Sequence, residues 1–228
     1  MKSVGIIGGL GPETTANFYL EVIFRCQQLN DNQRPSVVIG SVPLLFEIER
    51  DLIAHNTGIK RYIPFLQEEA RKLEKSGVDF LVMPCNSLHV FIDEIRAAVS
   101  IPVLSIVEET IKYLNSKDIK KVGLISTSAT IENKVYESKL SESGIEYVTP
   151  TDEQRSKIDT IIQRLVNGEH LDEDREFLID TANSISKDVS FVALACTDLQ
   201  LLNPESNKVE IFDTMKILAD STVAQILS

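Results

Sequence analysis

The sequence lacks paired cysteines, long apolar runs and an excess of basic residues, and each shortage excludes a class of protein. Its 228 residues include three cysteines without paired spacing, which fits a cytoplasmic protein with free thiols better than a disulfide scaffold. The longest apolar runs are far below the ~18 residues of a bilayer helix, so no membrane span or signal peptide is expected. With 23 Lys and Arg against 34 Asp and Glu, the net charge of −11 argues against nucleic acid as a partner.

Short β-branched runs alternate with segments of helical periodicity along the whole chain. Predicted strands lie at 3–8, 37–42, 79–84, 101–106, 120–126, 145–150, 190–195 and 209–212. Predicted helices lie at 13–29, 59–77, 85–99, 108–115, 130–144, 152–167, 172–186 and 213–227. This alternation predicts an α/β fold whose sheets are mainly parallel and are flanked by helices on both faces.

An internal repeat divides the chain into two halves. Residues 80–89 (FLVMPCNSLH) align without a gap with residues 191–200 (FVALACTDLQ), and both segments place a cysteine after a buried strand. Upstream of each cysteine, residues 4–14 and 122–132 again end a strand before a loop. The repeat predicts two pseudo-symmetric α/β domains, residues 1–100 plus 208–228 and residues 101–207, with a cleft between them.

The repeated cysteines are the leading candidates for chemistry. Cys85 and Cys196 both follow apolar strands and precede small polar residues, the place where ligands collect in parallel sheets. A single cysteine there is more often a buried apolar residue, but two at equivalent positions of a repeat favour function. Matched thiols on opposite sides of a cleft suit inversion of a carbon centre, which needs a base on one face and an acid on the other.

Other kinds of site fit the sequence less well. The sequence gives less support for a metal site, because no CxxC exists and His89 has no counterpart after Cys196. A cysteine hydrolase that uses His89 as its base is a minor alternative. The glycine-rich loop has threonine where a dinucleotide fingerprint needs its third glycine, so NAD is not expected. The loop residues Leu10 and Gly11, and Thr127 in the equivalent loop of the second half, are candidate contacts for a carboxylate.

Five segments together resemble the aspartate/glutamate racemase family, within the broader Asp/Glu/hydantoin racemase group. They are IGGLGPETT (7–15), MPCNSLH (83–89), IPVLSIVEET (101–110), VGLISTSATI (122–131) and LACTDLQLL (194–202). The resemblance implies a two-domain fold, a homodimer, and Cys85 and Cys196 as acid and base. It also implies that neither pyridoxal phosphate nor a metal is required.

The resemblance further implies contacts to the substrate. Asn86, Ser87 and Thr197 are expected at its α-carboxylate or amine, and Arg50 at a side-chain carboxylate. Lys157 matches a basic position of some relatives and is a second candidate to hold an anion. The chain departs from the family at Ser87, Asp198 and Leu218, where relatives commonly carry threonine, glutamate and histidine.

These observations predict a cytoplasmic, cofactor-independent racemase that acts on aspartate or glutamate by proton transfer between two cysteines. The small dicarboxylic amino acid is the expected partner. Other superfamily activities, those of a hydantoin racemase, a maleate isomerase or a malonate decarboxylase, remain alternatives. A non-catalytic protein that binds small acids is the alternative from a different class.

Overall fold

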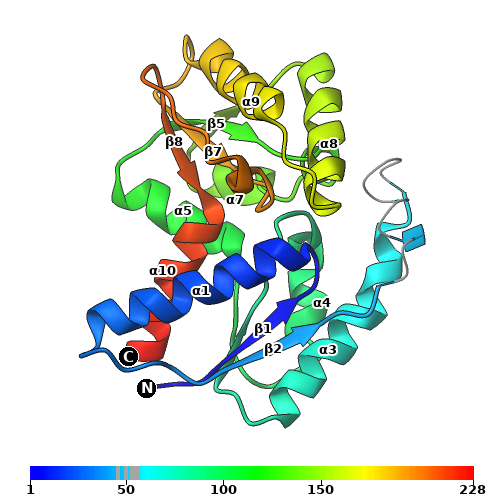
Figure 1. Ribbon diagram of the computed structural model, residues 1–228, viewed down its shortest axis with the longest axis vertical. Coiled ribbons are helices and arrows are strands. Elements are labelled where there is room, and N and C mark those ends of the chain that lie inside the picture. Colours follow the sequence, from blue (N-terminus) through cyan, green and yellow to red (C-terminus); the bar gives the residue numbers. More distant parts are fainter. Residues whose placement is uncertain (45–46, 49–50, 52–56) are drawn as a thin grey trace.

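The computed structural model describes residues 1–44, 47–48, 51 and 57–228, which form two four-stranded parallel sheets (Figure 1). The first sheet has the order β2-β1-β3-β4, with strands Val37–Ser41, Val4–Gly8, Phe80–Val82 and Val103–Leu104. The second has the order β6-β5-β7-β8, with strands Glu146–Val148, Lys121–Ile125, Phe191–Leu194 and Glu210–Asp213. The predicted class of helix-flanked parallel sheets is confirmed.

The two sheets repeat one arrangement of strands. β1 pairs with β2 and β3, and β5 pairs in the same way with β6 and β7. The strands that precede the two cysteines, β3 and β7, are interior strands at equivalent places in the two orders. The sequence repeat therefore corresponds to a repeated structural unit.

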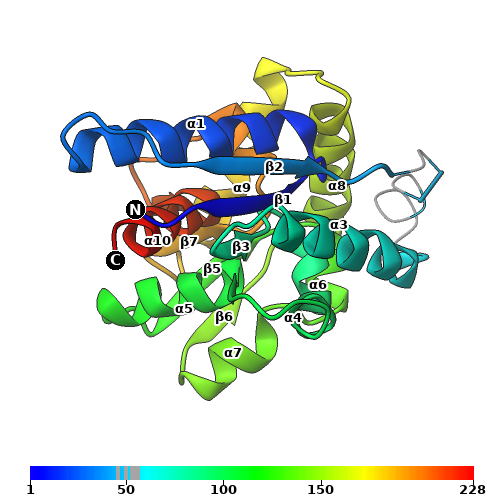
Figure 2. The ribbon, with the colours of Figure 1, turned by 90° about the horizontal axis from the view of Figure 1, so that it is seen from below.

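Helices cover both faces of each sheet. Figure 2 shows α1 (Pro12–Leu29) on one side of β1 and β2, with α3 (Ile63–Lys75) on the other. In the second half, α8 (Asp152–Val166) and α9 (Asp172–Ile185) pack on one face, and α5 (Ile106–Ser116) and α7 (Glu137–Glu142) pack on the opposite face. The shorter helices are η1 (Ile59–Tyr62), η2 (Ser87–Phe91), α4 (Ile92–Arg96), α6 (Ser128–Glu132) and η3 (Leu199–Leu202).

One apolar core is shared by both halves. Alternate residues of β1 and β5, such as Ile6 and Leu124, are buried in it together with side chains of α1, α5 and α10 (Thr214–Leu227). The opposite faces of the sheets pack into two separate cores, under α3 in the first half and under α8 and α9 in the second. The shared core fixes the two halves to each other.

Strand pairing differs from the predicted domain bounds at two places. β4 pairs with β3, so residues 103–104 join the first sheet although the predicted second domain begins at 101. β8 pairs with β7, so residues 210–213 join the second sheet although they fall in the predicted first domain. Each strand occupies the free edge beside the strand that precedes it. After β8 the chain returns to the first half, where α10 packs against α1 and the Lys2 N–H donates to the Ile226 carbonyl at 2.8 Å.

Two predicted helices are interrupted. The segment 130–144 is split into α6 and α7, because Lys134 between them adopts a left-handed backbone with φ of 54°. The segment 85–99 begins with the 3-10 helix η2 before α4. None of the helices in the described ranges is long and apolar enough to cross a membrane.

Candidate active site

Cys85 and Cys196 stand at the carboxyl ends of the two interior strands. Met83 and Pro84 separate Cys85 from β3, and Ala195 separates Cys196 from β7. Neither cysteine forms a disulfide bond within the described residues, and both line the same pocket between the halves. Cys85 is partly exposed, whereas Cys196 is buried with 6% exposure, so the two thiols share one cavity in unequal surroundings.

The pocket has a volume of about 60 Å³ and takes its walls from both halves. Loops that follow β1, β2, β3, β5 and β7 contribute, together with η1 and α8, so the carboxyl edges of the two sheets meet at this cavity. The lining residues are Leu10, Leu44, Tyr62, Cys85, Asn86, Ser87, Leu88, Thr127, Ile162, Val166, Cys196, Thr197 and Asp198. Apolar side chains with a small number of polar groups are the lining typical of a small-molecule site.

The Cys196 thiol lies beside the carboxylate of Asp198. Its Sγ is 3.9 Å from Asp198 Oδ2, a distance at which the thiol donates a weak hydrogen bond. Burial raises the pKa of Cys196 well above its usual value, and the negative charge of Asp198 raises it further. Cys196 therefore carries its proton at neutral pH, and a proton acceptor lies within reach of it.

Asp198 is held by the first helix of the other half. The Thr14 hydroxyl of α1 donates to Asp198 Oδ1 at 2.5 Å. A Cβ atom on Gly11 would lie 2.7 Å from the same oxygen, and Gly11 has a φ of +119°. Glycine is needed here because a side chain would strike the carboxylate and strain the backbone. Gly11 thus packs against Asp198, while its neighbour Leu10 lines the pocket.

Hydrogen bonds connect the Cys85 loop with the second half and the Cys196 loop with the first half. Asn86, beside Cys85, donates to the Thr214 hydroxyl at 3.1 Å, and Thr214 donates to the carbonyl of Leu194 at the end of β7. Thr197, beside Cys196, donates to the Pro84 carbonyl at 3.2 Å. The polar atoms of Asn86 and Thr197, predicted as substrate contacts, are therefore engaged within the protein and hold the loops at a fixed separation.

Asn86 has a second partner that the sequence analysis missed. The Tyr136 hydroxyl donates to Asn86 Oδ1 at 2.5 Å, and both side chains are buried. Burial raises the pKa of Tyr136, so its hydroxyl keeps the proton that it donates. Tyr136 and Thr214 complete the support of the Cys85 loop.

Three hydroxyl groups form a triangle between the two halves. Ser87 Oγ lies 3.0 Å from Thr127 Oγ1 and 2.9 Å from Thr130 Oγ1, and the two threonine oxygens are 2.9 Å apart. Ser87 and Thr127 are partly exposed and line the pocket. Hydroxyls can redirect their protons, so Ser87 and Thr127 are placed to donate to an anionic group of a ligand.

His89 is a structural residue of the Cys85 loop. Its Nδ1 lies 2.6 Å from the Cys85 carbonyl, to which it donates, and its Nε2 accepts from the Ile106 N–H at 3.1 Å. Burial lowers the pKa of His89 to about 4, in agreement with a neutral ring. Since both ring nitrogens are occupied by the backbone, this geometry leaves no nitrogen to serve as the base of a cysteine hydrolase.

The remaining predicted contacts and several missed residues complete the site. Arg50 lies outside the described residues. Lys157 is exposed on α8 and is not among the residues that line the pocket. Sequence reasoning missed the apolar lining residues Leu44, Tyr62, Ile162 and Val166. Their positions depend on how α8 and η1 pack over the sheets, and helical periodicity marks such residues only as buried.

Known proteins resemble this chain over most of its length. The family model described as Asp/Glu/Hydantoin racemase matches residues 7–222. The broad specificity amino-acid racemase RacX of Bacillus subtilis (strain 168) is 35% identical over 230 residues, with 99% of this chain and 98% of that protein covered.

Two solved structures share the whole architecture. A candidate Asp/Glu racemase from Yersinia pestis superposes with a TM-score of 0.85 at 27% identity, with 100% of both chains covered. The aspartate racemase of Picrophilus torridus gives a TM-score of 0.81 at 24% identity, with 99% of this chain and 94% of that chain covered. The chain belongs to the Asp/Glu/hydantoin racemase family, and it is a racemase of that family with the two-sheet α/β fold.

Proposed function

We propose that the protein interconverts the enantiomers of a free amino acid by proton transfer between Cys85 and Cys196. The observation that carries the proposal is the presence of both thiols, at equivalent strand ends of a repeated unit, in the wall of one pocket. Inversion needs two groups that exchange the roles of acid and base, and two identical side chains meet this need. A non-catalytic binding protein would not need the matched thiols.

The reaction balances with the two thiols alone. A thiolate removes the α-proton, the Cα–H bond breaks, and the electron pair stays on the α-carbon and its carboxylate. The opposite thiol then donates its proton to the other face of that carbon, and the new Cα–H bond forms as the second thiolate appears. Because Cys196 rests in the protonated form, it begins as the acid in one direction. In the reverse direction it must first lose its proton, and Asp198 Oδ2 is placed to accept it.

The pocket supplies the means to stabilise the carbanionic intermediate. Ser87 and Thr127 present hydroxyls to the cavity, and donors fixed in advance at a developing negative charge lower the barrier. The hydrogen bonds between the cysteine loops hold the thiols in place before substrate binds. These features support a reaction that proceeds without pyridoxal phosphate.

The acidic substrate expected from the resemblance depends on Arg50, outside the described residues, and on Lys157, which does not line the pocket.

A cytoplasmic location remains a proposal. For the proposed homodimer, the exposed side chains of Leu20 and Phe24 on α1 offer apolar surface, and sedimentation of the purified protein tests it.

Exchange of the α-proton in heavy water tests the mechanism. The native protein should racemise its substrate with incorporation of deuterium, followed by proton magnetic resonance and chiral chromatography. Cys85→Ala and Cys196→Ala should each abolish racemisation, yet each should exchange one enantiomer through the remaining thiol, and the two variants should prefer opposite enantiomers. Near-native racemisation by either variant, or exchange of the same enantiomer by both, contradicts the two-thiol mechanism.

A further inference from the structure

We infer that the substrate side chain lies against an apolar wall of the pocket, so that the preferred substrates are amino acids with uncharged side chains. The inference rests on the proposed racemisation and names the substrate class of the same site. It replaces the acidic side chain expected from the resemblance. The observations that carry it are the chemistry of the lining residues and the partners of the nearby cations.

The lining residues fall into two chemical groups. The polar ones belong to the loops of the cysteines and to Thr127, the residues that can contact groups shared by all amino acids. The others are apolar or aromatic and come from both halves: Leu10, Leu44, Tyr62, Leu88, Ile162 and Val166. The first four pack on the core under α3, and the last two pack on the core under α8. A substrate side chain placed between these cores therefore contacts apolar groups on two sides.

Charge in the described part of the lining is negative. Asp198 contributes a carboxylate, and no lysine, arginine or histidine occurs among the described residues that line the pocket. A carboxylate side chain would leave water without a counter-ion and would approach Asp198. The net charge of −11 also opposes the approach of an anion. An uncharged side chain meets neither obstacle.

Arginine side chains on two helices that line the pocket form ion pairs with carboxylates outside its lining. On α8, Arg164 makes a two-pronged ion pair with Asp174 through its Nε and Nη2 atoms, and Arg155 pairs with Asp152. On η1, Arg61 pairs with Glu47 at 2.8 Å and with Asp51 at 3.2 Å. α8 thus presents Ile162 and Val166 to the cavity while two of its arginines are held by carboxylates of their own half.

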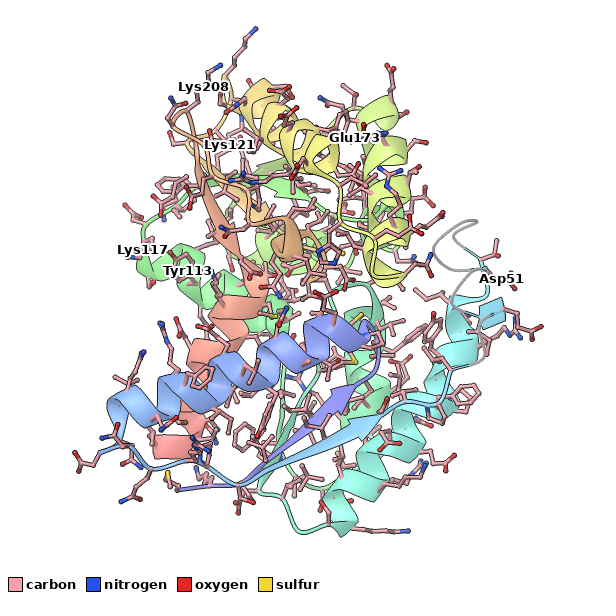
Figure 3. The ribbon with its side chains drawn as sticks, in the orientation of Figure 1. Asp51, Tyr113, Lys117, Lys121, Glu173 and Lys208 are labelled. Carbon is pink, nitrogen blue, oxygen red and sulfur yellow. The ribbon has the colours of Figure 1, made fainter. Side chains whose placement is uncertain are left out.

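Cations of the second sheet lie far from the cavity. Lys121 begins β5 and Lys208 precedes β8, so both stand at the amino ends of strands, opposite the edge that carries Cys196. Figure 3 shows both residues at the end of the second half that is remote from the first half. The carboxyl edges of the sheets therefore hold the thiols without help from these charges.

Pairs of substrates that differ in charge but hardly in shape test the inference. The native full-length protein is assayed in heavy water with L-aspartate against L-asparagine, and with L-glutamate against L-glutamine, beside L-alanine, L-leucine and L-methionine. The expected kcat/KM for the amides and aliphatic amino acids is at least tenfold above that for the acids. A preference for the acids overturns the inference, and its loss in Arg50→Ala would assign that preference to Arg50. Failure of every amino acid to exchange overturns the proposed racemisation, and the inference with it.

A charge placed in the apolar wall gives a second, independent test. Val166 stands at the end of α8, partly exposed, where a longer side chain is tolerated better than at the buried Ile162. Val166→Lys should raise the ratio of kcat/KM for L-aspartate over L-asparagine by tenfold or more, whereas the uncharged control Val166→Gln should leave it within about twofold. Circular dichroism and thermal melting verify that both variants fold. An unchanged ratio in folded Val166→Lys shows that this wall does not meet the side chain and overturns the inference.

Discussion

Replacing Asp198 with asparagine should lower the pKa of the Cys196 thiol. The change removes a negative charge 3.9 Å from Sγ and leaves an amide of nearly the same size. At an effective dielectric constant of about 20, two unit charges at this separation interact by about 4 kcal/mol at most, so loss of the carboxylate charge favours the thiolate. Burial still opposes the thiolate, and the backbone N–H groups of Asp198 and Leu199 still favour it. The pKa of Cys196 is therefore expected to fall toward its usual value while burial keeps it raised.

A background with one thiol makes this fall measurable. The chain has three cysteines, so Cys26→Ala together with Cys85→Ser leaves Cys196 as the only one. The ultraviolet absorbance of the thiolate is titrated against pH with and without Asp198→Asn. Thr14→Val is the matched control, because it removes the hydrogen bond to Asp198 and keeps the charge. An equal or higher pKa in Asp198→Asn would refute the electrostatic reasoning.

Under the proposed mechanism, the same variant separates two roles of Asp198 in racemisation. As a negative charge it holds the proton on Cys196, but as an acceptor it lets that proton leave. If the second role limits the rate, Asp198→Asn should slow exchange of the α-proton with solvent by at least tenfold for the enantiomer from which Cys196 removes it, and should slow exchange of the other enantiomer less. Equal slowing of exchange from both enantiomers contradicts the acceptor role.

Three further substitutions test the support of the site. Gly11→Ala should destabilise the fold by about 1–3 kcal/mol in urea unfolding, because the methyl group meets Asp198 at 2.7 Å on a backbone of positive φ; an unchanged midpoint contradicts this packing. Tyr136→Phe removes the hydrogen bond to buried Asn86 and should cost about 1–2 kcal/mol by the same assay, and a smaller loss means that the bond is weak. Burial raises the pKa of Asp213 from 3.8 to about 7, so the folded protein binds the extra proton and stability should fall as pH rises through that range, by about 4 kcal/mol at most. Asp213→Asn keeps the cap of α10 and should flatten this pH dependence of the melting temperature, and an unaltered dependence assigns it to other groups.

Local sequence signals were sufficient to predict the repeated unit. The segments around Cys85 and Cys196 carry a buried strand, a thiol and polar residues in one order, and these signals do not depend on distant contacts. Parallel pairing then places each thiol at the carboxyl edge of its own sheet. The two edges meet at one cavity because the halves pack on a shared core. The predicted fold class agrees with the two parallel sheets and their flanking helices.

The supporting contacts could not be predicted in this way. Tyr136 lies in a segment that reads as one helix, and only the interruption at Lys134 and the packing of α7 bring its hydroxyl to Asn86. Thr214 reaches the same side chain because β8 joins the second sheet before α10 turns back. Both contacts join residues far apart in sequence, and periodicity within a segment carries no information about them.

Divergence between the repeats gives the two thiols different chemistry. At the repeat offset, Ser87 of the first half corresponds to Asp198 of the second, so each thiol has a polar residue two positions later but only Cys196 has a charged one. That charge, with burial, keeps the proton on Cys196 and supplies an acceptor for it, whereas Ser87 joins the hydroxyl triangle with Thr127 and Thr130. A symmetric pair would start with no distinction between acid and base. Burial and the carboxylate of Asp198 together therefore keep Cys196 in the acid form, and under the proposed mechanism this resting state sets which enantiomer the protein is ready to receive.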